Sequence, residues 1–141
     1  MAAYNKFNQF VEDLGLGEHV LSAAGDVLRV YLSNVAPDAA LDLIKTDLAE
    51  FAGGTGYTAQ GIDIQNGWSE AAGTATLTGV DAVWTAGASD WAAFRYVVLF
   101  NDTNAAPLDP LISWWDYGSA LTLLNTETFT VDFGASVLTL V

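Results

Sequence analysis

The sequence predicts a mainly β protein (α+β class), an antiparallel β sandwich or barrel with two short helices in its N-terminal third. Strand-like segments separated by turns fill residues 91–141, which is typical of antiparallel sheets. Helical spacing of apolar residues occurs earlier, over residues 4–14 and 38–52. The 141 residues predict a single domain, 1–141, large enough to bury a core without disulfides or metals.

The first predicted element is a helix over residues 4–14, and Gly15 is placed to end it. Its apolar residues recur at positions i, i+3, i+4 and i+7, which is one face of a helix. These residues are Phe7, Phe10, Val11 and Leu14. A strand follows over residues 27–32, where side chains alternate between two faces. We expect its purely aliphatic face to point into the core, and that face consists of Leu28, Val30 and Leu32.

The second predicted helix spans residues 38–52. Asp38 near its start suits the positive end of the helix dipole, and Gly53 follows its last residue. One stripe of apolar side chains is expected to dock this helix on the sheet. The stripe consists of Ala40, Leu41, Ile44, Leu48 and Phe51.

The rest of the chain is predicted as strands, over residues 57–64, 73–78, 80–85, 91–100, 111–117, 119–124, 126–133 and 137–141. The strand at 91–100 should be central in its sheet, because both of its faces are largely apolar. Alternation predicts one face with Phe94, Tyr96, Val98 and Phe100, and the other with Arg95, Val97 and Leu99. Arg95 must then pair with a carboxylate or with backbone carbonyls, because an unpaired buried charge is costly.

The chain is strongly acidic, with a formal net charge of −13. Its basic residues are Lys6, Arg29, Lys45 and Arg95. Phosphate backbones repel such a surface, so we expect no nucleic-acid partner. We interpret the acidic surface as a solvated face, and a docking surface for a basic partner or a cation is the alternative.

The sequence offers no sign of a membrane protein. No apolar run approaches the roughly 20 residues of a membrane-spanning helix. The N-terminus lacks the basic region and apolar core of a secretory leader, so we expect no membrane partner. The chain has no cysteine, so export to an oxidising compartment is neither supported nor excluded.

His19 is the single histidine, which excludes metal sites built from several histidines. A Ser-His-Asp triad would have to use His19, which stands in no nucleophile-elbow context. We expect a packed or turn-capping role for it. The glycines at 53–56 follow a predicted helix, whereas phosphate-binding loops follow a strand and open a helix.

Three carboxylates of the C-terminal strands, Asp116, Glu127 and Asp132, are candidates for paired acid–base chemistry. We expect them to be exposed strand residues instead. The oxygen-rich segment at 101–104 lacks the glycine and the distal glutamate of a calcium loop, and an ordinary Asx turn explains it better. The expectation is therefore a protein that is no enzyme and has no metal or cofactor.

Aromatic residues are more numerous than one small core needs, with five Trp, seven Phe and five Tyr. Some should therefore lie at a subunit contact. Around residues 114–117, alternation places Trp114 with Asp116 and Trp115 with Tyr117. A core or interface role is preferred for these rings, and a sugar-stacking platform is the alternative. The candidate interface residues are Trp68, Trp91, Trp114, Trp115 and Tyr117.

The chain resembles small structural proteins of tailed bacteriophages over nearly its whole length. The segments that carry the resemblance are 4–7, 10–14, 17–19, 26–37, 56–58, 94–103 and 110–118. The resemblance implies a virion component of the capsid decoration (cement) type. It also implies an outer position on the phage head, synthesis in the host cytoplasm, and no catalytic residues.

The expected partners are therefore the major capsid protein and further copies of the chain, and the resemblance suggests a trimer. Decoration would stabilise the assembled shell by binding it. A receptor-binding or glycan-binding module of a tail or fibre is the alternative, based on the tryptophan and tyrosine content. An enzyme such as a small glycosidase is the least favoured hypothesis, because it depends only on spare carboxylates.

Overall fold

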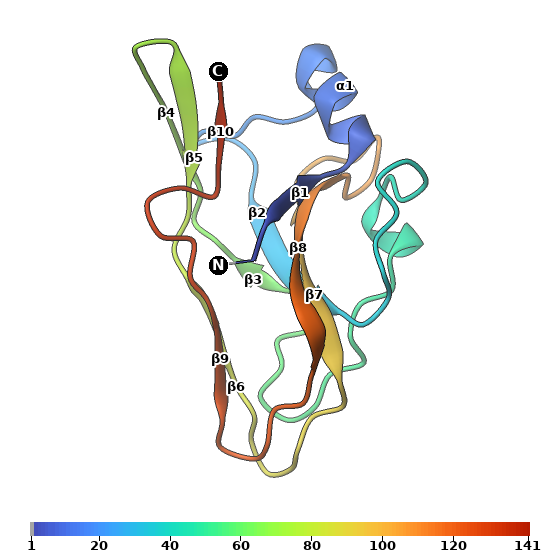
Figure 1. Ribbon diagram of the computed structural model, residues 1–141. Helices are drawn as coiled ribbons and strands as arrows, with labels where there is room; N and C mark the ends of the chain where they lie inside the picture. Colours follow the sequence, from blue (N-terminus) through green and yellow to red (C-terminus); the bar gives the residue numbers. More distant parts are fainter. Residues whose placement is uncertain (1) are drawn as a thin grey trace.

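The computed structural model describes residues 2–141 and is mainly β, with antiparallel sheets (Figure 1). One α-helix, α1 (Asn8–Leu16), and one short 3-10 helix, η1 (Lys45–Asp47), accompany the strands within this range. The strands are β1 (Tyr4–Lys6), β2 (Leu28–Ser33), β3 (Ile62–Asp63), β4 (Gly67–Ala71), β5 (Thr74–Thr78), β6 (Ala82–Thr85), β7 (Phe94–Asn101), β8 (Leu111–Leu121), β9 (Thr128–Val131) and β10 (Leu138–Leu140).

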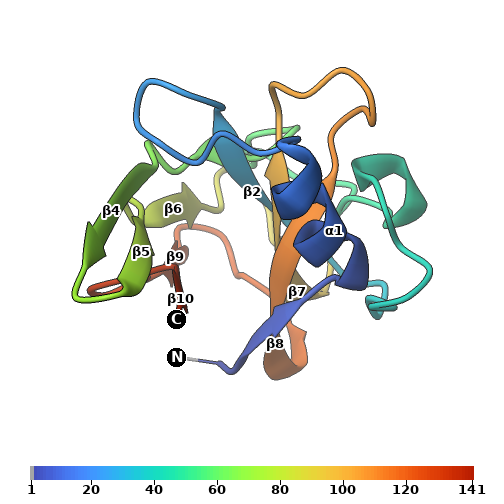
Figure 2. The ribbon, with the colours of Figure 1, turned by 90° about the horizontal axis from the view of Figure 1, so that it is seen from above.

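The strands form three sheets. The largest has the order β1-β8-β7-β2-β3, and the smaller sheets are β10-β5-β4 and β6-β9. Since β6 follows β5 and β10 follows β9 in the chain, the two small sheets continue one another. Figure 2 shows them together on one side of the molecule, with the five-stranded sheet and α1 on the other.

The main core lies between the five-stranded sheet and the small sheets. Leu28, Val30 and Leu32 of β2 are all 0% exposed and belong to this cluster, which confirms the predicted core face. The opposite layer contributes apolar side chains of the small sheets and their connections. These are Leu77, Ala82, Trp84, Val131, Phe133, Val137 and Leu138.

A second, smaller apolar cluster covers the opposite face of the five-stranded sheet. Its members are Phe7, Tyr31, Leu48, Tyr96, Val98, Phe100 and Leu111. Tyr31 donates its phenolic hydrogen to the Leu48 carbonyl oxygen at 2.9 Å, which fixes the covering segment to β2. Strand β7 is therefore central and buried on both faces, as predicted.

The predicted faces of β7 are correct from Tyr96 to Phe100, but not at Phe94. Tyr96, Val98 and Phe100 share the smaller cluster, whereas Phe94 lies in the main core. The cause is an irregular pairing with β8, in which Phe94 lies opposite Leu121 and Tyr96 lies opposite Asp116. Such a bulge interrupts strict alternation and reverses the faces beyond it.

The prediction of a helix over residues 4–14 was wrong at both ends. Tyr4–Lys6 forms β1, which pairs with β8 in the register Tyr4↔Trp115. The helix starts at Asn8, and it is capped by Gly17 at φ 79° rather than ended by Gly15. Edge pairing with β8 therefore replaces the first predicted turn of the helix.

The prediction of a helix over residues 38–52 was wrong. The Asp38 carboxylate accepts the backbone N–H groups of Ala40 and Leu41 at 2.9 and 3.2 Å. Such local bonds compete with helical hydrogen bonding. The segment also pairs outward, because Lys45 donates its backbone N–H to the Asp109 carbonyl oxygen at 2.9 Å. Only the 3-10 turn η1 remains of the predicted helix.

The apolar stripe of that predicted helix is divided accordingly. Leu48 and Phe51 are buried, Ala40 is exposed, Ile44 is half-buried, and Leu41 is 73% exposed. The strands expected at 73–78, 80–85, 126–133 and 137–141 are present in shortened form. Of the strand expected at 57–64 only β3 is found, β4 was not predicted, and β8 runs past Gly118 instead of ending there.

Candidate functional site

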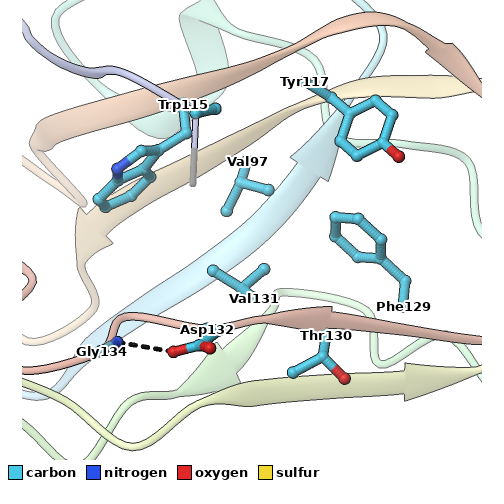
Figure 3. A pocket seen from close by; sticks show the side chains of 9 residues that line it. Val97, Trp115, Tyr117, Phe129, Thr130, Val131, Asp132 and Gly134 are labelled. Atoms are coloured by element: carbon cyan, nitrogen blue, oxygen red, sulfur yellow. Dashed lines mark hydrogen bonds between the residues drawn. The ribbon is translucent and has the colours of Figure 1, made fainter.

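An apolar pocket with a volume of about 390 Å³ opens between β7 and β8 of the large sheet and β9 of the small sheet. Figure 3 shows side chains from both layers pointing toward one another across it. The lining residues are Ala2, Val97, Trp115, Tyr117, Phe129, Thr130, Val131, Asp132 and Gly134. We call this the β8–β9 pocket.

Strand alternation assembles both walls of this pocket. Trp115 and Tyr117 lie on the same face of β8, as predicted, and Val97 of β7 lies opposite Trp115 in the register. On β9, Phe129 lies across from Tyr117, with ring centroids 6.3 Å apart in an edge-to-face arrangement. The contact between these two rings joins the two layers beside the opening.

The exposure of Tyr117 follows from the irregular end of β8. Gly118 adopts φ 96° and donates its N–H to Asp116 Oδ1 at 2.8 Å, so the backbone of β8 is irregular just after Tyr117. Tyr117 is 54% exposed and forms part of the rim. A bulge of this kind is a common way to redirect one side chain of a strand.

Arg95 and Asp116 anchor the same bulge. Arg95 Nε and its terminal nitrogen contact the two carboxylate oxygens of Asp116 at 2.7 and 2.8 Å. The prediction that Arg95 pairs with a carboxylate is confirmed, although about a third of each side chain is exposed. The Arg95 hydrogen bonds, followed by the Gly118 N–H, hold the pKa of Asp116 below its ordinary value.

Strand β9 brings a free backbone edge to the pocket. Among the described residues it pairs with β6 along one side, and its other side has no neighbour in the sheet. Unpaired N–H and C=O groups on such an edge are a template for another strand. The β8–β9 pocket therefore combines apolar walls with open main-chain hydrogen-bonding groups.

The predicted interface residues are spread over the molecule. Trp115 and Tyr117 meet in the β8–β9 pocket, and Trp115 is 4% exposed. Trp91 is 2% exposed and donates its indole N–H to the Thr55 carbonyl oxygen at 3.0 Å. Trp114 is half-buried against Phe7, on the opposite face of the sheet, and Trp68 is half-buried against the main core.

Sequence reasoning missed the second wall of the pocket, formed by Phe129, Val131 and Asp132. The period-two pattern at 126–133 contains the signal that Phe129 and Val131 share a face. No local pattern says which strand lies opposite that face. The pairing of β9 with β6, rather than with β8, decides it.

His19 is packed in the interior and takes no part in the pocket. Its Nδ1 lies 3.1 Å from Asn101 Nδ2, and its Nε2 lies 3.9 Å from Asp13 Oδ2. Burial lowers its pKa, although neighbouring carboxylates oppose the shift. His19 is 7% exposed and its ring centroid lies 5.3 Å from that of Phe10, in agreement with the predicted packing role.

The candidate acid–base carboxylates are separate and already engaged. Asp116 pairs with Arg95, Glu127 accepts the Leu124 N–H at 2.9 Å, and Asp132 accepts the Gly134 N–H at 2.7 Å. Within residues 2–141, no group of three or more His, Cys, Asp or Glu side chains is placed to hold a metal.

The other sequence candidates are structural turns. Asn101 Oδ1 accepts the backbone N–H groups of Thr103 and Asn104 at 2.9 and 3.3 Å, which confirms the predicted Asx turn. Gly56, at φ 95°, lies so close to the Thr85 carbonyl oxygen that a Cβ would collide with it. The glycines at 53–56 thus serve close packing of the backbone.

Two further observations bear on the protein as a whole. No helix among residues 2–141 has the length and apolar character needed to cross a membrane. No protein-family model, curated protein or solved structure matches the chain.

Proposed function

We propose that the protein is a non-enzymatic structural component of a phage virion, a capsid decoration protein that binds the outer shell and stabilises it. The β8–β9 pocket is the observation that carries this proposal. The resemblance of the sequence to small phage structural proteins supplies the identity of the partner, the major capsid protein. The proposal places the chain on the surface of the phage head.

The pocket suits an extended segment of another polypeptide. Such a segment can add to the free edge of β9 through main-chain hydrogen bonds and place an apolar side chain between Trp115 and Phe129. Each apolar Å² removed from water contributes about 25 cal/mol. Many such contacts act together when copies are arrayed on one shell.

The proposal includes two finer points about architecture. We interpret the layer of small sheets over the five-stranded sheet as a sandwich. We also expect the chain to self-associate, with a trimer as the first candidate, either in solution or on the shell. Light scattering at micromolar concentration measures self-association in solution. A monomer that also fails to bind shells would contradict self-association both in solution and on the shell.

Binding to stripped shells tests the proposed function through Tyr117. This side chain is 54% exposed, so Tyr117→Asp introduces a charge at the rim of the pocket without disturbing the core. Val80→Asp is the matched control, because Val80 is 53% exposed and lies outside the pocket lining. We expect fewer bound copies of Tyr117→Asp than of the parent and of the control; equal binding by all three would contradict a contact through this pocket.

A glycan-binding module of a tail or fibre is the second candidate, and the exposed ring of Tyr117 favours it. Sugars stack on such rings, but they also need several polar side chains around them. The pocket offers Thr130 and Asp132, and one Asp132 oxygen already caps Gly134. A glycan array decides between the two, because a decoration protein is expected to show no sugar preference.

A further inference from the structure

Asn66 and Gly67 form the single Asn-Gly pair of the sequence. In such a pair the backbone nitrogen of glycine can attack the side-chain amide carbon of asparagine, because glycine has no side chain to obstruct the approach and its backbone turns freely. The new C–N bond closes a succinimide ring, and the side-chain nitrogen leaves as ammonia with the proton of the attacking nitrogen. Water then opens the ring and yields aspartate or isoaspartate, so the pair is a candidate site of spontaneous modification.

Asn66 lies directly before β4, at the wall of a cavity of about 260 Å³. The other lining residues of this cavity are Ala23, Gly25, Asp26, Val27, Asp63 and Gln65. Asn66 is 5% exposed, so it is nearly buried but adjoins a cavity instead of the deep core. A small local movement is therefore enough to bring water to its amide.

Three hydrogen bonds hold the Asn66 side chain in place. Its Oδ1 accepts the Leu28 N–H at 3.2 Å, and its Nδ2 donates to the carbonyl oxygens of Leu21 and Ser22 at 2.9 and 3.4 Å. Attack by the glycine nitrogen requires this side chain to turn toward its own backbone and to release its nitrogen. These bonds must break first, so the fold protects Asn66 for as long as they persist.

The protecting carbonyl groups belong to a loop, residues 20–26, between α1 and β2. The loop is closed by two bonds: Asp26 donates its N–H to the Val20 carbonyl oxygen, and Val20 donates its N–H to Asp26 Oδ2, both at 2.7 Å. Asn101 Nδ2 also donates to Asp26 Oδ2, at 2.6 Å. Loops of this kind open locally at a lower free energy than the whole protein unfolds.

Modification removes the groups that close this contact. In aspartate, an oxygen replaces the Nδ2 that donates to Leu21 and Ser22, so a charged acceptor faces two carbonyl oxygens. A nearly buried carboxylate without a donor is costly. In isoaspartate the backbone gains a methylene group and the side chain loses one, which displaces the remaining acceptor from Leu28. Neither product restores the original contacts.

We propose that Asn66–Gly67 is a deamidation site controlled by the loop at 20–26, and that its modification keeps this loop from closing again. The closed loop protects the amide, and each opening exposes it to ring closure and water. Because the reaction cannot be reversed by refolding, the modified fraction records how long the loop has been open. The chemistry needs only water, so it is independent of the proposed capsid partner.

Peptide mapping by mass spectrometry measures the modification in the full chain. Trypsin cleaves after Lys45 and Arg95 and releases residues 46–95, whose single asparagine is Asn66. Replacement of the amide by a carboxyl group adds about 1 Da. We expect this mass increase to accumulate about tenfold more slowly, or slower still, in the folded protein than in urea. Equal rates, or no modification in urea, would overturn the proposal.

Variants of the loop test whether its opening controls the rate. Gly25→Ala places a Cβ against the Val20 carbonyl oxygen and should speed modification of the folded protein by about threefold or more. Gly15→Ala is the matched control, because the added Cβ meets open space there, and it should leave the rate unchanged. If Gly25→Ala does not fold, Asp26→Ala replaces it, since it removes the acceptor of the Val20 N–H. A parental rate in the folded loop variant would refute control by the loop.

Asn66→Asp tests whether modification keeps the loop open. We expect amide hydrogen exchange at residues 20–26 to be about tenfold faster in this variant than in the parent. Gln65→Glu is the control, because it makes the same change at the preceding, exposed residue and should leave the exchange unchanged. Parental exchange in Asn66→Asp, or equal acceleration in both variants, would show that the carboxylate does not oppose closure.

Discussion

His19 shows at the residue scale how burial makes a single side chain sensitive to pH. Asn101 Nδ2 donates toward its Nδ1, since Asn101 Oδ1 already accepts two backbone N–H groups, so Nδ1 is the unprotonated nitrogen. The remaining N–H on Nε2 faces Asp13. The folded protein therefore favours neutral His19, because a proton on Nδ1 would face the N–H donor of Asn101.

The first prediction is a loss of stability in mild acid. Because the folded-state pKa of His19 is lowered from 6.5, its contribution is present above that value and is lost as the pH falls through the folded-state pKa. His19→Gln should flatten the dependence of the unfolding free energy on pH between about 7 and 5. Urea melts across that range measure it, and an unchanged slope would contradict the account.

Leu48 gives the second residue-scale prediction. It is 0% exposed in the smaller apolar cluster, so Leu48→Asp buries a carboxylate and should lower the unfolding free energy by roughly 3 kcal/mol or more. Leu41→Asp is the control, because Leu41 is 73% exposed and should change stability by less than about 0.5 kcal/mol. Equal losses of unfolding free energy in Leu48→Asp and Leu41→Asp would contradict this structure of the segment and favour the helix predicted over residues 38–52.

At the scale of elements, the segment before Leu48 is held by aspartate side chains. Asp47 Oδ2 accepts the N–H groups of Leu43 and Ile44, each at 3.0 Å. Asp47→Ala should therefore cost about 1 kcal/mol, as loss of a cap does, whereas Asp47→Asn keeps the acceptor and should cost less. Chemical denaturation measures both, and equal costs would show that the carboxyl oxygen does not hold the segment.

The spacing of apolar residues explains which elements could be predicted from the sequence. The alternation of β2 and β7 is strict over most of their lengths, and their core faces follow from it. Residues 38–52 have helical spacing as well, but local side-chain bonds of Asp38 and Asp47 compete with helical hydrogen bonding. Pairing with residues 109–111, which is a tertiary contact, also draws the segment away from a helix. The shared face of Trp115 and Tyr117 in the β8–β9 pocket was predictable because both residues lie on one strand.

The remaining features depend on contacts between distant segments. Phe94 enters the main core at a bulge. Between the pairs Phe94↔Leu121 and Tyr96↔Asp116, β8 contains more residues than β7. The partner strand of β9 is likewise a matter of topology. Neither leaves a local signal in the sequence, and the wall formed by Phe129 and Val131 was missed for that reason.

At the scale of the whole molecule, the net charge of −13 bears on the proposed decoration of a shell. If copies are arrayed on a shell as proposed, they repel one another, and apolar burial in the β8–β9 pocket must offset that repulsion.

The resulting prediction is that occupancy on stripped shells holds steady or rises as salt is added. Salt screens the repulsion between copies over a Debye length of about 8 Å near physiological ionic strength. Counting bound copies from low to high salt measures this. A steep fall would mean that exposed charge pairs with a basic capsid patch dominate binding.

The proposed function is decided by locating the chain in a reconstruction of phage particles that contain it. We predict density for this fold on the outer surface of the head, with an extended segment of the major capsid protein beside β9 and over Tyr117. Density on the tail or fibres, inside the head, or on the head with the β8–β9 pocket facing solvent would contradict it.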